Sequence, residues 1–390
     1  DAARRVDALL RVAGRLARTA PSGRIVLARL ARMLDPVWIS EELAAELERA
    51  ASRAAEPLAG REVERALRGA WGVKPTDELE ELDLEPVAVT PTAQVHRGVL
   101  DGEAVAVKLL RPGIVAVVRQ DLVLLDGLAA PLHAAFPALD PGALIREIRE
   151  RIQDELDLEH EAESMRRFHR ALRSHPFLTV PSPVTRLAHA EVLVSAWVDG
   201  VPISSAPDPD LAAARLLVFV IGAARFGVMH ADPDHDDVLV LPDGRLAILD
   251  FGATRTVVPD RVASTAQALA AFAADDAAGL GTALAKLGAL PESEATALIE
   301  LIHHALGELA TPGPARLDAA AMIATGDRLR SRRDEVLRVA RAGSLAPEDL
   351  WPARAAAQLF AVITRLGASG DWLELTRAAL RDGWDVAAGP

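Results

Sequence analysis

Apolar and polar residues alternate along two stretches of this chain, and elsewhere they mostly follow a helical repeat. Between residues 86 and 110, valine and alanine alternate with polar residues, and Asp101-Gly102 interrupts the pattern. This alternation around an Asp-Gly pair predicts two antiparallel strands joined by a tight turn. Two shorter apolar runs, 238–241 and 246–249, flank Pro242-Asp243-Gly244 and predict a second hairpin.

Most of the remaining chain has apolar residues at the three-to-four-residue spacing of helices. Half of all residues are apolar, and the abundance of alanine favours helix. We therefore predict an α+β protein in three parts: a helical N-terminal extension at 1–80, a strand-containing lobe with inserted helices at 81–205, and a mostly helical lobe at 206–390. The apolar run at 211–229 contains two arginines, so it predicts a buried helix rather than a bilayer crossing.

Charge and composition restrict the function. The net charge of −13 argues against nucleic acid as a partner. The chain has no cysteine, which excludes disulfides and cysteine-based metal sites and fits a reducing cytoplasm. The first 33 residues hold eight arginines and only two aspartates. This basic segment has two interpretations: a helix attracted to an anionic membrane surface, which would make the protein peripheral to the membrane, or the solvated face of a docked helix.

Three motifs carry the candidate chemistry. Val105-Ala106-Val107-Lys108 ends an apolar strand, and Lys108 is one of only three lysines among 43 basic residues. A loop follows about 120 residues later, from His230-Ala231-Asp232 to Asp237, and Asp250-Phe251-Gly252 comes after the second hairpin. A strand lysine, an HxD loop and an Asp-Phe-Gly turn in this order are typical of kinase-like phosphoryl transfer.

Each residue type suits one part of that chemistry. Lys108 is expected to contact the α- and β-phosphates of ATP, and Asp232 to orient or deprotonate an acceptor. Asp250 and Asp237 are expected to ligate Mg²⁺ through oxygen, which hard cations prefer. A carboxylate usually aims such a lysine, and an acidic helix predicted over 149–166 offers Glu150, Asp154, Glu155, Asp157, Glu159, Glu161 and Glu163.

With these motifs the chain resembles the UbiB (AarF-type) family of atypical kinases and ATPases. Ala93-Gln94-Val95-His96-Arg97 looks like the end of the family's alanine-rich loop, and Glu155-Leu156-Asp157 looks like its ExD signature. The resemblance implies a protein-kinase-like bilobal fold. It further implies that Glu161 pairs with Lys108, and that nucleotide binding involves Ala93, Gln94, Glu155, Asp157, Ser195, Ala196 and Trp197.

The resemblance implies a magnesium-dependent, ATP-binding kinase or ATPase linked to isoprenoid lipid or quinone metabolism. Two departures support an alternative, a nucleotide-binding pseudokinase with a regulatory or scaffold role. Pro21-Ser22-Gly23-Arg24 stands near the family's KxGQ motif without its lysine or glutamine, and the loop 232–237 holds four aspartates in six residues. A third reading is a small-molecule phosphotransferase of the aminoglycoside or choline kinase type, which shares the HxD loop.

Overall fold

The computed structural model describes residues 56–90 and 92–387. Its first lobe is built on an antiparallel sheet with strand order β1-β3-β4-β6, and β2 pairs with the end of β3. Asp101 and Gly102 both have positive φ at the turn between β3 and β4, as the Asp-Gly pair predicted. The strands are β1 (Glu81–Leu82), β2 (Ala88–Val89), β3 (Ala93–Leu100), β4 (Glu103–Leu110) and β6 (Val192–Ala196).

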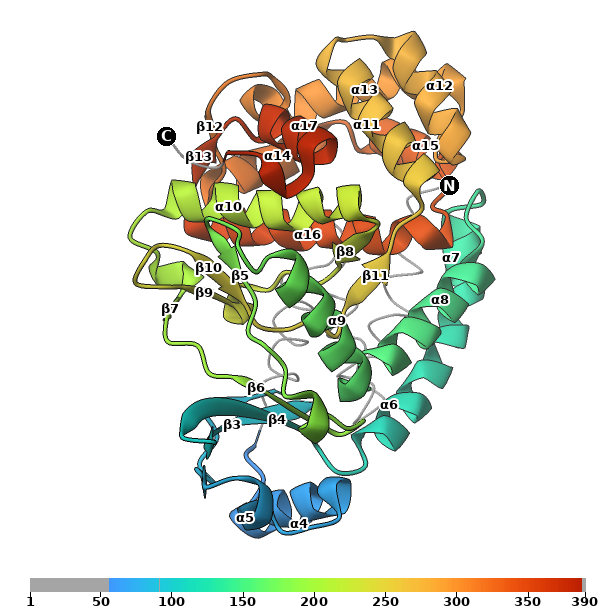
Figure 1. The fold of residues 1–390 in the computed structure, drawn as a ribbon. Coiled ribbons are helices and arrows are strands. Elements are labelled where there is room, and N and C mark those ends of the chain that lie inside the picture. The colour runs from blue at the N-terminus through green and yellow to red at the C-terminus, as the bar shows by residue number, and fades with distance from the viewer. Residues whose placement is uncertain (1–55, 91, 388–390) are drawn as a thin grey trace.

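Two short helices, α4 (Gly60–Trp71) and α5 (Pro75–Glu78), lie on the side of this sheet away from the second lobe (Figure 1). Val63 and Leu67 of α4 pack against Val107 and Leu109 of β4, all four fully buried. The described part of the predicted N-terminal extension is therefore helical and forms one small core with the sheet. Residues 1–55, including the basic segment and the degenerate KxGQ position, lie outside the described residues.

A run of helices follows β4: α6 (Ile114–Val123), η1 (Leu124–Leu128), α7 (Ala129–Ala135), α8 (Pro141–Asp154) and α9 (Leu158–Ala171). Helices α6, α7 and α8 lie along one side of the molecule, and α9 lies nearer its middle (Figure 1). The single acidic helix predicted over 149–166 was wrong, because α8 ends at Asp154 and α9 begins at Leu158. Asp157 caps α9 by accepting the backbone N–H groups of Glu159 and His160. A side-chain cap satisfies N–H groups that have no partner within the helix, so the ExD segment is a turn between two helices.

The second lobe holds small sheets. The predicted hairpin forms between β9 (Val238–Val240) and β10 (Leu246–Ile248). Two strands from the segment assigned to the first lobe join this sheet, since β5 (Leu178–Thr179) pairs with β10 and β7 (Val201–Pro202) pairs with β9. The chain therefore reaches the second sheet twice before residue 205, and the three-part domain division stays a prediction. The other strands are β8 (Val228–His230), β11 (Thr254–Thr256), β12 (Ala315–Arg316) and β13 (Ser369–Gly370).

Helices form the rest of the second lobe. The apolar run at 211–229 begins as α10 (Pro209–Gly222), whose central residues Leu216 to Phe219 are fully buried. No helix among the described residues combines the length and apolarity that a membrane crossing needs. The remaining α-helices are α11 (Pro259–Ala273), α12 (Ala277–Leu287), α13 (Ala295–Leu306), α14 (Ala319–Ser331), α15 (Arg333–Ala342), α16 (Pro347–Leu366) and α17 (Trp372–Asp382).

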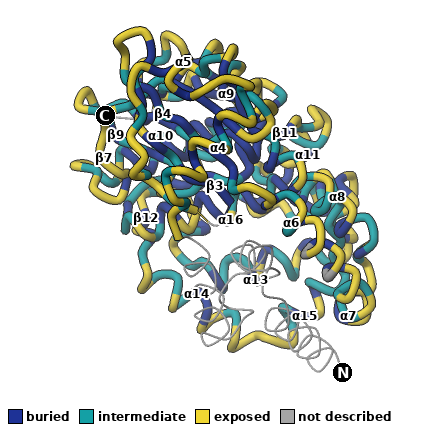
Figure 2. The backbone as a smooth tube through the Cα atoms, turned by 90° about the horizontal axis from the view of Figure 1, so that it is seen from below, coloured by how far each residue is buried: buried dark blue, intermediate teal, exposed yellow. Residues whose placement is uncertain are grey.

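The main hydrophobic core joins the inner side of the first sheet to the second lobe. It contains Leu110 and Leu193 of the sheet, Phe168 of α9, Phe219 of α10 and Leu359 of α16. In Figure 2 the buried stretches gather in the middle of the molecule, where α9, α10 and β4 are labelled. The polar site described next therefore lies beside a continuous core rather than between two loosely joined lobes.

Candidate functional site

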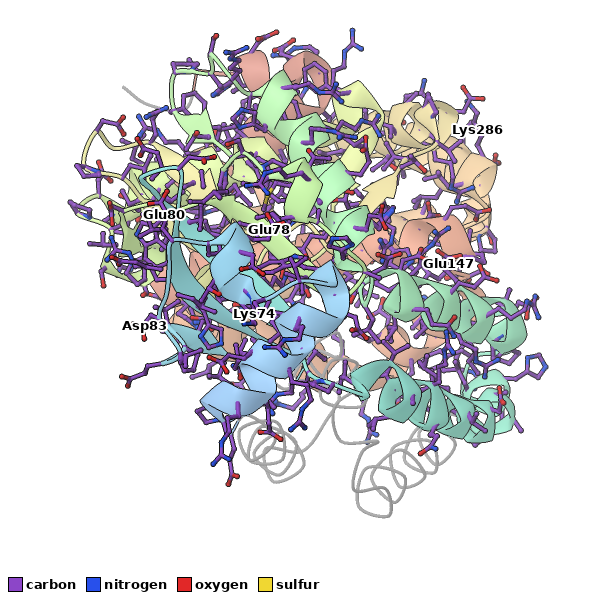
Figure 3. All side chains as sticks on the ribbon, turned by 60° about the horizontal axis from the view of Figure 1, so that its bottom comes forward. Lys74, Glu78, Glu80, Asp83, Glu147 and Lys286 are labelled. Carbon is purple, nitrogen blue, oxygen red and sulfur yellow. The ribbon has the colours of Figure 1, made fainter. Side chains whose placement is uncertain are left out.

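Lys108 lies on the face of the first sheet that is turned toward the second lobe. Its cross-strand neighbours are Val95 on β3 and Leu193 on β6, and residues directly opposite in a ladder share a face. Lys108 is partly buried, whereas Lys74 and Lys286 are exposed and lie far apart on the surface (Figure 3). The structure therefore places one lysine inside and leaves the two other lysines in solvent.

Three elements meet at the Lys108 ammonium. Its Nζ donates to both carboxylate oxygens of Glu161 on α9, at 2.8 Å each. It also donates to Oδ2 of Asp250, at 2.7 Å. Burial disfavours the charged lysine, but the two facing carboxylates outweigh it and raise the Lys108 pKa above its ordinary value. Lys108 is thus a fixed cation, and we call these three residues the lysine cluster.

Glu161 connects the lysine to the Asp-Phe-Gly turn. Its side chain is only 1% exposed, and Oε1 also accepts the backbone N–H of Phe251 at 3.3 Å. Burial and the neighbouring Asp250 carboxylate raise the pKa of Glu161 to about 7, although Lys108 opposes this shift. The geometry gives Glu161 the pairing that the family resemblance implied, while its functional role stays a prediction.

Asp250 follows β10 at a tight turn that fixes its carboxylate. Oδ1 accepts the backbone N–H of Gly252 at 2.9 Å, and His230 Nε2 donates to the Asp250 carbonyl. Burial opposes ionisation, but the Lys108 ammonium lowers the pKa of Asp250 below its ordinary value. Phe251 is fully buried, with its ring 5.0 Å from that of Phe168 on α9. The turn is therefore held by both polar and aromatic contacts.

Asp237 ends the short 3₁₀ turn η5 (His235–Asp237) and lies next to the hairpin that leads to Asp250. Its carbonyl accepts the backbone N–H of Leu249 at 2.9 Å. Burial and then the charge of Asp250 raise the pKa of Asp237 well above its ordinary value. Asp237 and Asp250 thus repel each other, and Lys108 is the one cation of the lysine cluster, so carboxylates outnumber cations at this site.

Asp232 lies between β8 and η5, and two side chains of α16 hold it. Arg354 Nη2 donates to Oδ2 at 2.5 Å, and Gln358 Nε2 donates to Oδ1 at 3.2 Å. The Asp232 side chain is 24% exposed, whereas that of Arg354 is 4% exposed. Neither Arg354 nor Gln358 was predicted from the sequence, because both lie more than 100 residues beyond the motifs and no local pattern marks them.

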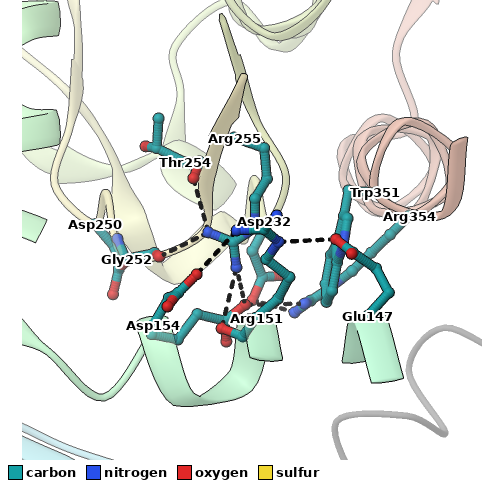
Figure 4. Close-up of polar contacts among 11 residues, drawn as sticks. Glu147, Arg151, Asp154, Asp232, Asp250, Gly252, Thr254, Arg255, Trp351 and Arg354 are labelled. Atoms are coloured by element: carbon teal, nitrogen blue, oxygen red, sulfur yellow. Dashed lines mark hydrogen bonds and ion pairs between the residues drawn. The ribbon is translucent and has the colours of Figure 1, made fainter. Parts of the chain in front are cut away.

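Glu155 lies in a second buried cluster with Arg255 and Arg354. Figure 4 shows these two arginines together with Asp232 and Trp351. Glu155 Oε1 accepts from Arg255 Nη2 at 3.2 Å and is 3.5 Å from Arg354 Nη1. Both guanidinium groups also stack on the Trp351 ring, at 5.1 and 5.4 Å from its centroid. Glu155 therefore contacts arginines in the structure. We call Asp232, Arg354, Glu155 and Arg255 the arginine cluster.

The structure does not bring the side chain of Gln94 together with Lys108. Gln94 is fully buried on the opposite face of the first sheet, opposite Leu109 in the ladder. There its Nε2 donates to His96 Nε2 at 2.6 Å, and its Oε1 accepts the backbone N–H of Leu58 at 2.9 Å. Ala93 is the buried first residue of β3, and its carbonyl accepts the backbone N–H of Thr90.

The predicted adenine-side segment is the chain that leaves the first sheet. Ser195 pairs with Ala106, on the same sheet face as Lys108, and is buried. The backbone N–H of Trp197 donates to the Ala104 carbonyl at 3.0 Å, and the Trp197 ring lies under Arg97. Ala196 is the last residue of β6, and the chain then continues to β7 in the second lobe. The segment thus connects the two sheets beside the lysine cluster.

A family model decides the relationship. The ABC1 atypical kinase-like domain matches residues 51–284, more than half of the chain. The chain belongs to this family. The match includes the lysine cluster and Asp232 and ends well before α16. The UbiB-type resemblance and the kinase-like fold predicted from the sequence are therefore confirmed.

Curated relatives and a solved structure agree with this assignment. A probable protein kinase UbiB of Marinobacter nauticus is 31% identical over 215 residues, which cover 51% of this chain and 39% of the relative. The chloroplastic protein ACTIVITY OF BC1 COMPLEX KINASE 3 of Arabidopsis thaliana is 31% identical over 180 residues, 43% of this chain and 25% of the relative. The match thus spans less than half the length of either relative.

The solved structure of Rv3197 in complex with erythromycin, from Mycobacterium tuberculosis, is similar over 92% of this chain and 91% of its own. The TM-score is 0.65 at 25% identity. Because the similarity leaves only 8% of the chain uncovered, it includes most of the helical residues beyond 284.

Proposed function

We propose that the chain is a magnesium-dependent, ATP-binding atypical kinase or ATPase whose phosphate site is the lysine cluster. The observation that carries the proposal is the meeting of Lys108, Glu161 and Asp250 within hydrogen-bond distance, from three separate elements. Phosphoryl transfer depends on positioning and charge neutralisation, and a lysine aimed by a buried glutamate supplies both.

The donor set fits a magnesium ion. Asp250 and Asp237 offer carboxylate oxygens, and the raised pKa of Asp237 reflects burial and repulsion from Asp250. A divalent cation between them would relieve that repulsion, and oxygen ligands are those that magnesium prefers. When bound, MgATP would supply the transferable phosphoryl group and the charge that neutralises these carboxylates.

The chain's own residues would divide the remaining work. Lys108 would hold the α- and β-phosphates while Glu161 keeps its ammonium aimed. Asp232 would orient the attacking hydroxyl or water and accept its proton. Lys108 also contacts Asp250 directly, so magnesium and phosphate would compete with that ion pair.

Release of phosphate from ATP tests the proposal. Wild type should hydrolyse ATP, or transfer its phosphate, only with magnesium present. The Asp250→Asn variant should lose at least 90% of that activity. Asp243→Asn is the matched control, because Asp243 is an exposed residue of the same hairpin that pairs with Arg245. Equal activity in wild type and Asp250→Asn would reject the proposal.

A pseudokinase is the second candidate, and a specific observation favours it. The Lys108 ammonium pairs directly with the Asp250 carboxylate at 2.7 Å. If this ion pair persists with nucleotide bound, Asp250 does not take up magnesium and the site binds without turnover. Nucleotide binding with no phosphate release in wild type would support this candidate over the kinase.

We also propose a metabolic link and a membrane contact for this chain. A link to isoprenoid lipid or quinone metabolism rests on the family resemblance. A peripheral contact with an anionic membrane surface in the cytoplasm rests instead on the eight arginines among the first 33 residues. Sedimentation of the full chain with vesicles containing anionic lipid, compared with neutral vesicles, tests the contact. Equal binding to both would reject the electrostatic part.

A further inference from the structure

Helix α16 lies along the loop that carries Asp232 and contacts it through one face. Arg354 and Gln358 both reach Asp232, and Arg365 near the helix end contacts the His235 ring. These positions are spaced by four and seven residues, which places them on the same side of a helix. The helix lies outside the 51–284 match, so the family domain alone does not contain the residues that hold its own HxD aspartate.

The loop itself supplies no permanent cation for Asp232. Between His230 and Asp237 the sequence has four aspartates and two histidines but no lysine or arginine. The guanidinium of Arg354 comes instead from more than 100 residues later and is almost fully buried. A buried guanidinium beside a carboxylate forms a strong, directional pair, because its alternative partners in water are excluded.

A second contact fixes how the carboxylate is turned. The pair with Arg354 uses Oδ2, and the Gln358 amide donates to Oδ1. Two donors on two different oxygens restrain rotation of the carboxylate about its bond to Cβ. Arg354 is itself held, because its Nη1 lies 3.5 Å from Glu155 Oε1. The Trp351 ring also packs against its guanidinium (Figure 4).

We infer that Arg354 and Gln358 are positioning residues for Asp232, supplied by a helix beyond the matched domain. Arg354 balances the charge of Asp232, and Gln358 sets the orientation in which its remaining lone pairs meet an acceptor. Neither side chain lies in the lysine cluster, so both should affect the turnover step rather than nucleotide affinity. It rests on the proposed function only for its kinetic part.

The kinetic test uses Gln358→Leu, which removes one donor and keeps the buried ion pair. We expect turnover of MgATP to fall about tenfold, or about 1.4 kcal/mol, while KM and nucleotide affinity stay within twofold. In an Asp232→Asn background the same change should have less than a twofold effect, because the carboxylate it orients is gone. Ala357→Leu, at the neighbouring exposed position of α16, is the matched control and should match wild type.

Three kinetic outcomes would overturn the positioning role: an equal loss in both backgrounds, a loss of nucleotide affinity, or no loss at all. If wild type shows no turnover, the proposed function itself fails, and a double-mutant cycle on stability then tests the contact.

The losses in free energy of unfolding caused by Arg354→Met and Asp232→Asn should be non-additive in the double variant, because the two residues share a buried contact. Additive changes would show that Arg354 does not hold Asp232, whatever the enzyme activity.

Discussion

The lysine cluster and the arginine cluster are neighbours with opposite charge balance. The lysine cluster sets one cation, Lys108, against two carboxylates, Glu161 and Asp250, with Asp237 close by. The arginine cluster sets Arg354 and Arg255 against Asp232 and Glu155, so its formal charges cancel. In the lysine cluster the carboxylates outnumber the cations, so this cluster is suited to take up a metal ion. The arginine cluster is complete as it stands and is suited to hold a carboxylate in place.

This difference in charge balance predicts how each cluster responds when a cation is added or removed. Adding a cation should stabilise the lysine cluster, because its carboxylates repel one another. Removing a cation should damage the arginine cluster more, because Asp232 would lose the guanidinium that balances its charge while keeping the neutral Gln358 amide.

Arg354→Met should have the largest effect on folding. The variant removes the guanidinium that balances Asp232 and one of the arginines that contact Glu155, and breaking a buried ion pair costs about 3–5 kcal/mol. Urea unfolding measures this. Arg330→Met, which breaks an exposed ion pair with Asp327, is the control and should cost no more than about 1 kcal/mol. Similar losses in the two variants would contradict the assignment of Arg354 to a buried network.

Lys108→Arg should lower MgATP turnover at least about 100-fold, or about 2.7 kcal/mol, although the charge is kept. The longer, planar guanidinium cannot occupy the compact position between Glu161 and Asp250. Steady-state phosphate release measures the effect. Lys286→Arg, on the exposed face of α12, should leave turnover unchanged. Wild-type turnover in Lys108→Arg would separate Lys108 from the chemistry.

Glu161→Gln should lower nucleotide affinity and turnover about tenfold more than Glu159→Gln does. Glu161 contacts Lys108, whereas Glu159 lies exposed two residues earlier on the same helix. Nucleotide affinity and turnover of both variants, each compared with wild type, measure the difference. The importance of the pair would be refuted by equal losses.

Glu161 should also make stability depend on pH. Its pKa is raised to about 7 in the folded protein, so between about pH 4.5 and 7 the folded state binds more protons than the unfolded state. The free energy of unfolding of wild type relative to Glu161→Gln should therefore fall as pH rises through this window, by on the order of 1 kcal/mol. Melting temperatures of both proteins from pH 4.5 to 8 measure this, and a relative stability that rises with pH would show the sign to be wrong.

The two clusters also differ in how much of each could be predicted from the sequence. Lys108, Asp232 and Asp250 belong to short motifs whose order defines the fold, and the two hairpins followed from alternation and turn residues. Arg354 could not be predicted in this way, because a contact across 122 residues leaves no local periodicity. Gln94 shows a different limit. Its position in a motif suggested a site residue, but strand alternation turns its side chain to the other face of the sheet.

The break between α8 and α9 has a local cause that the pattern obscured. The acidic residues from Glu150 to Glu163 suit one long helix, yet Asp157 caps a new helix and ends that run. An Asp in the middle of a helical pattern was the available signal.

The most direct test of a magnesium-dependent nucleotide site at the lysine cluster is a thermal-shift titration with ATP, with and without magnesium, on wild type and Asp250→Asn. A ligand that binds only the folded state stabilises it by about 2.7 kcal/mol at a hundredfold excess over Kd. We predict a rise in melting temperature that requires magnesium and is lost in Asp250→Asn. No shift with any nucleotide, or an equal shift in both proteins, would contradict a magnesium-dependent nucleotide site at Lys108, Glu161 and Asp250.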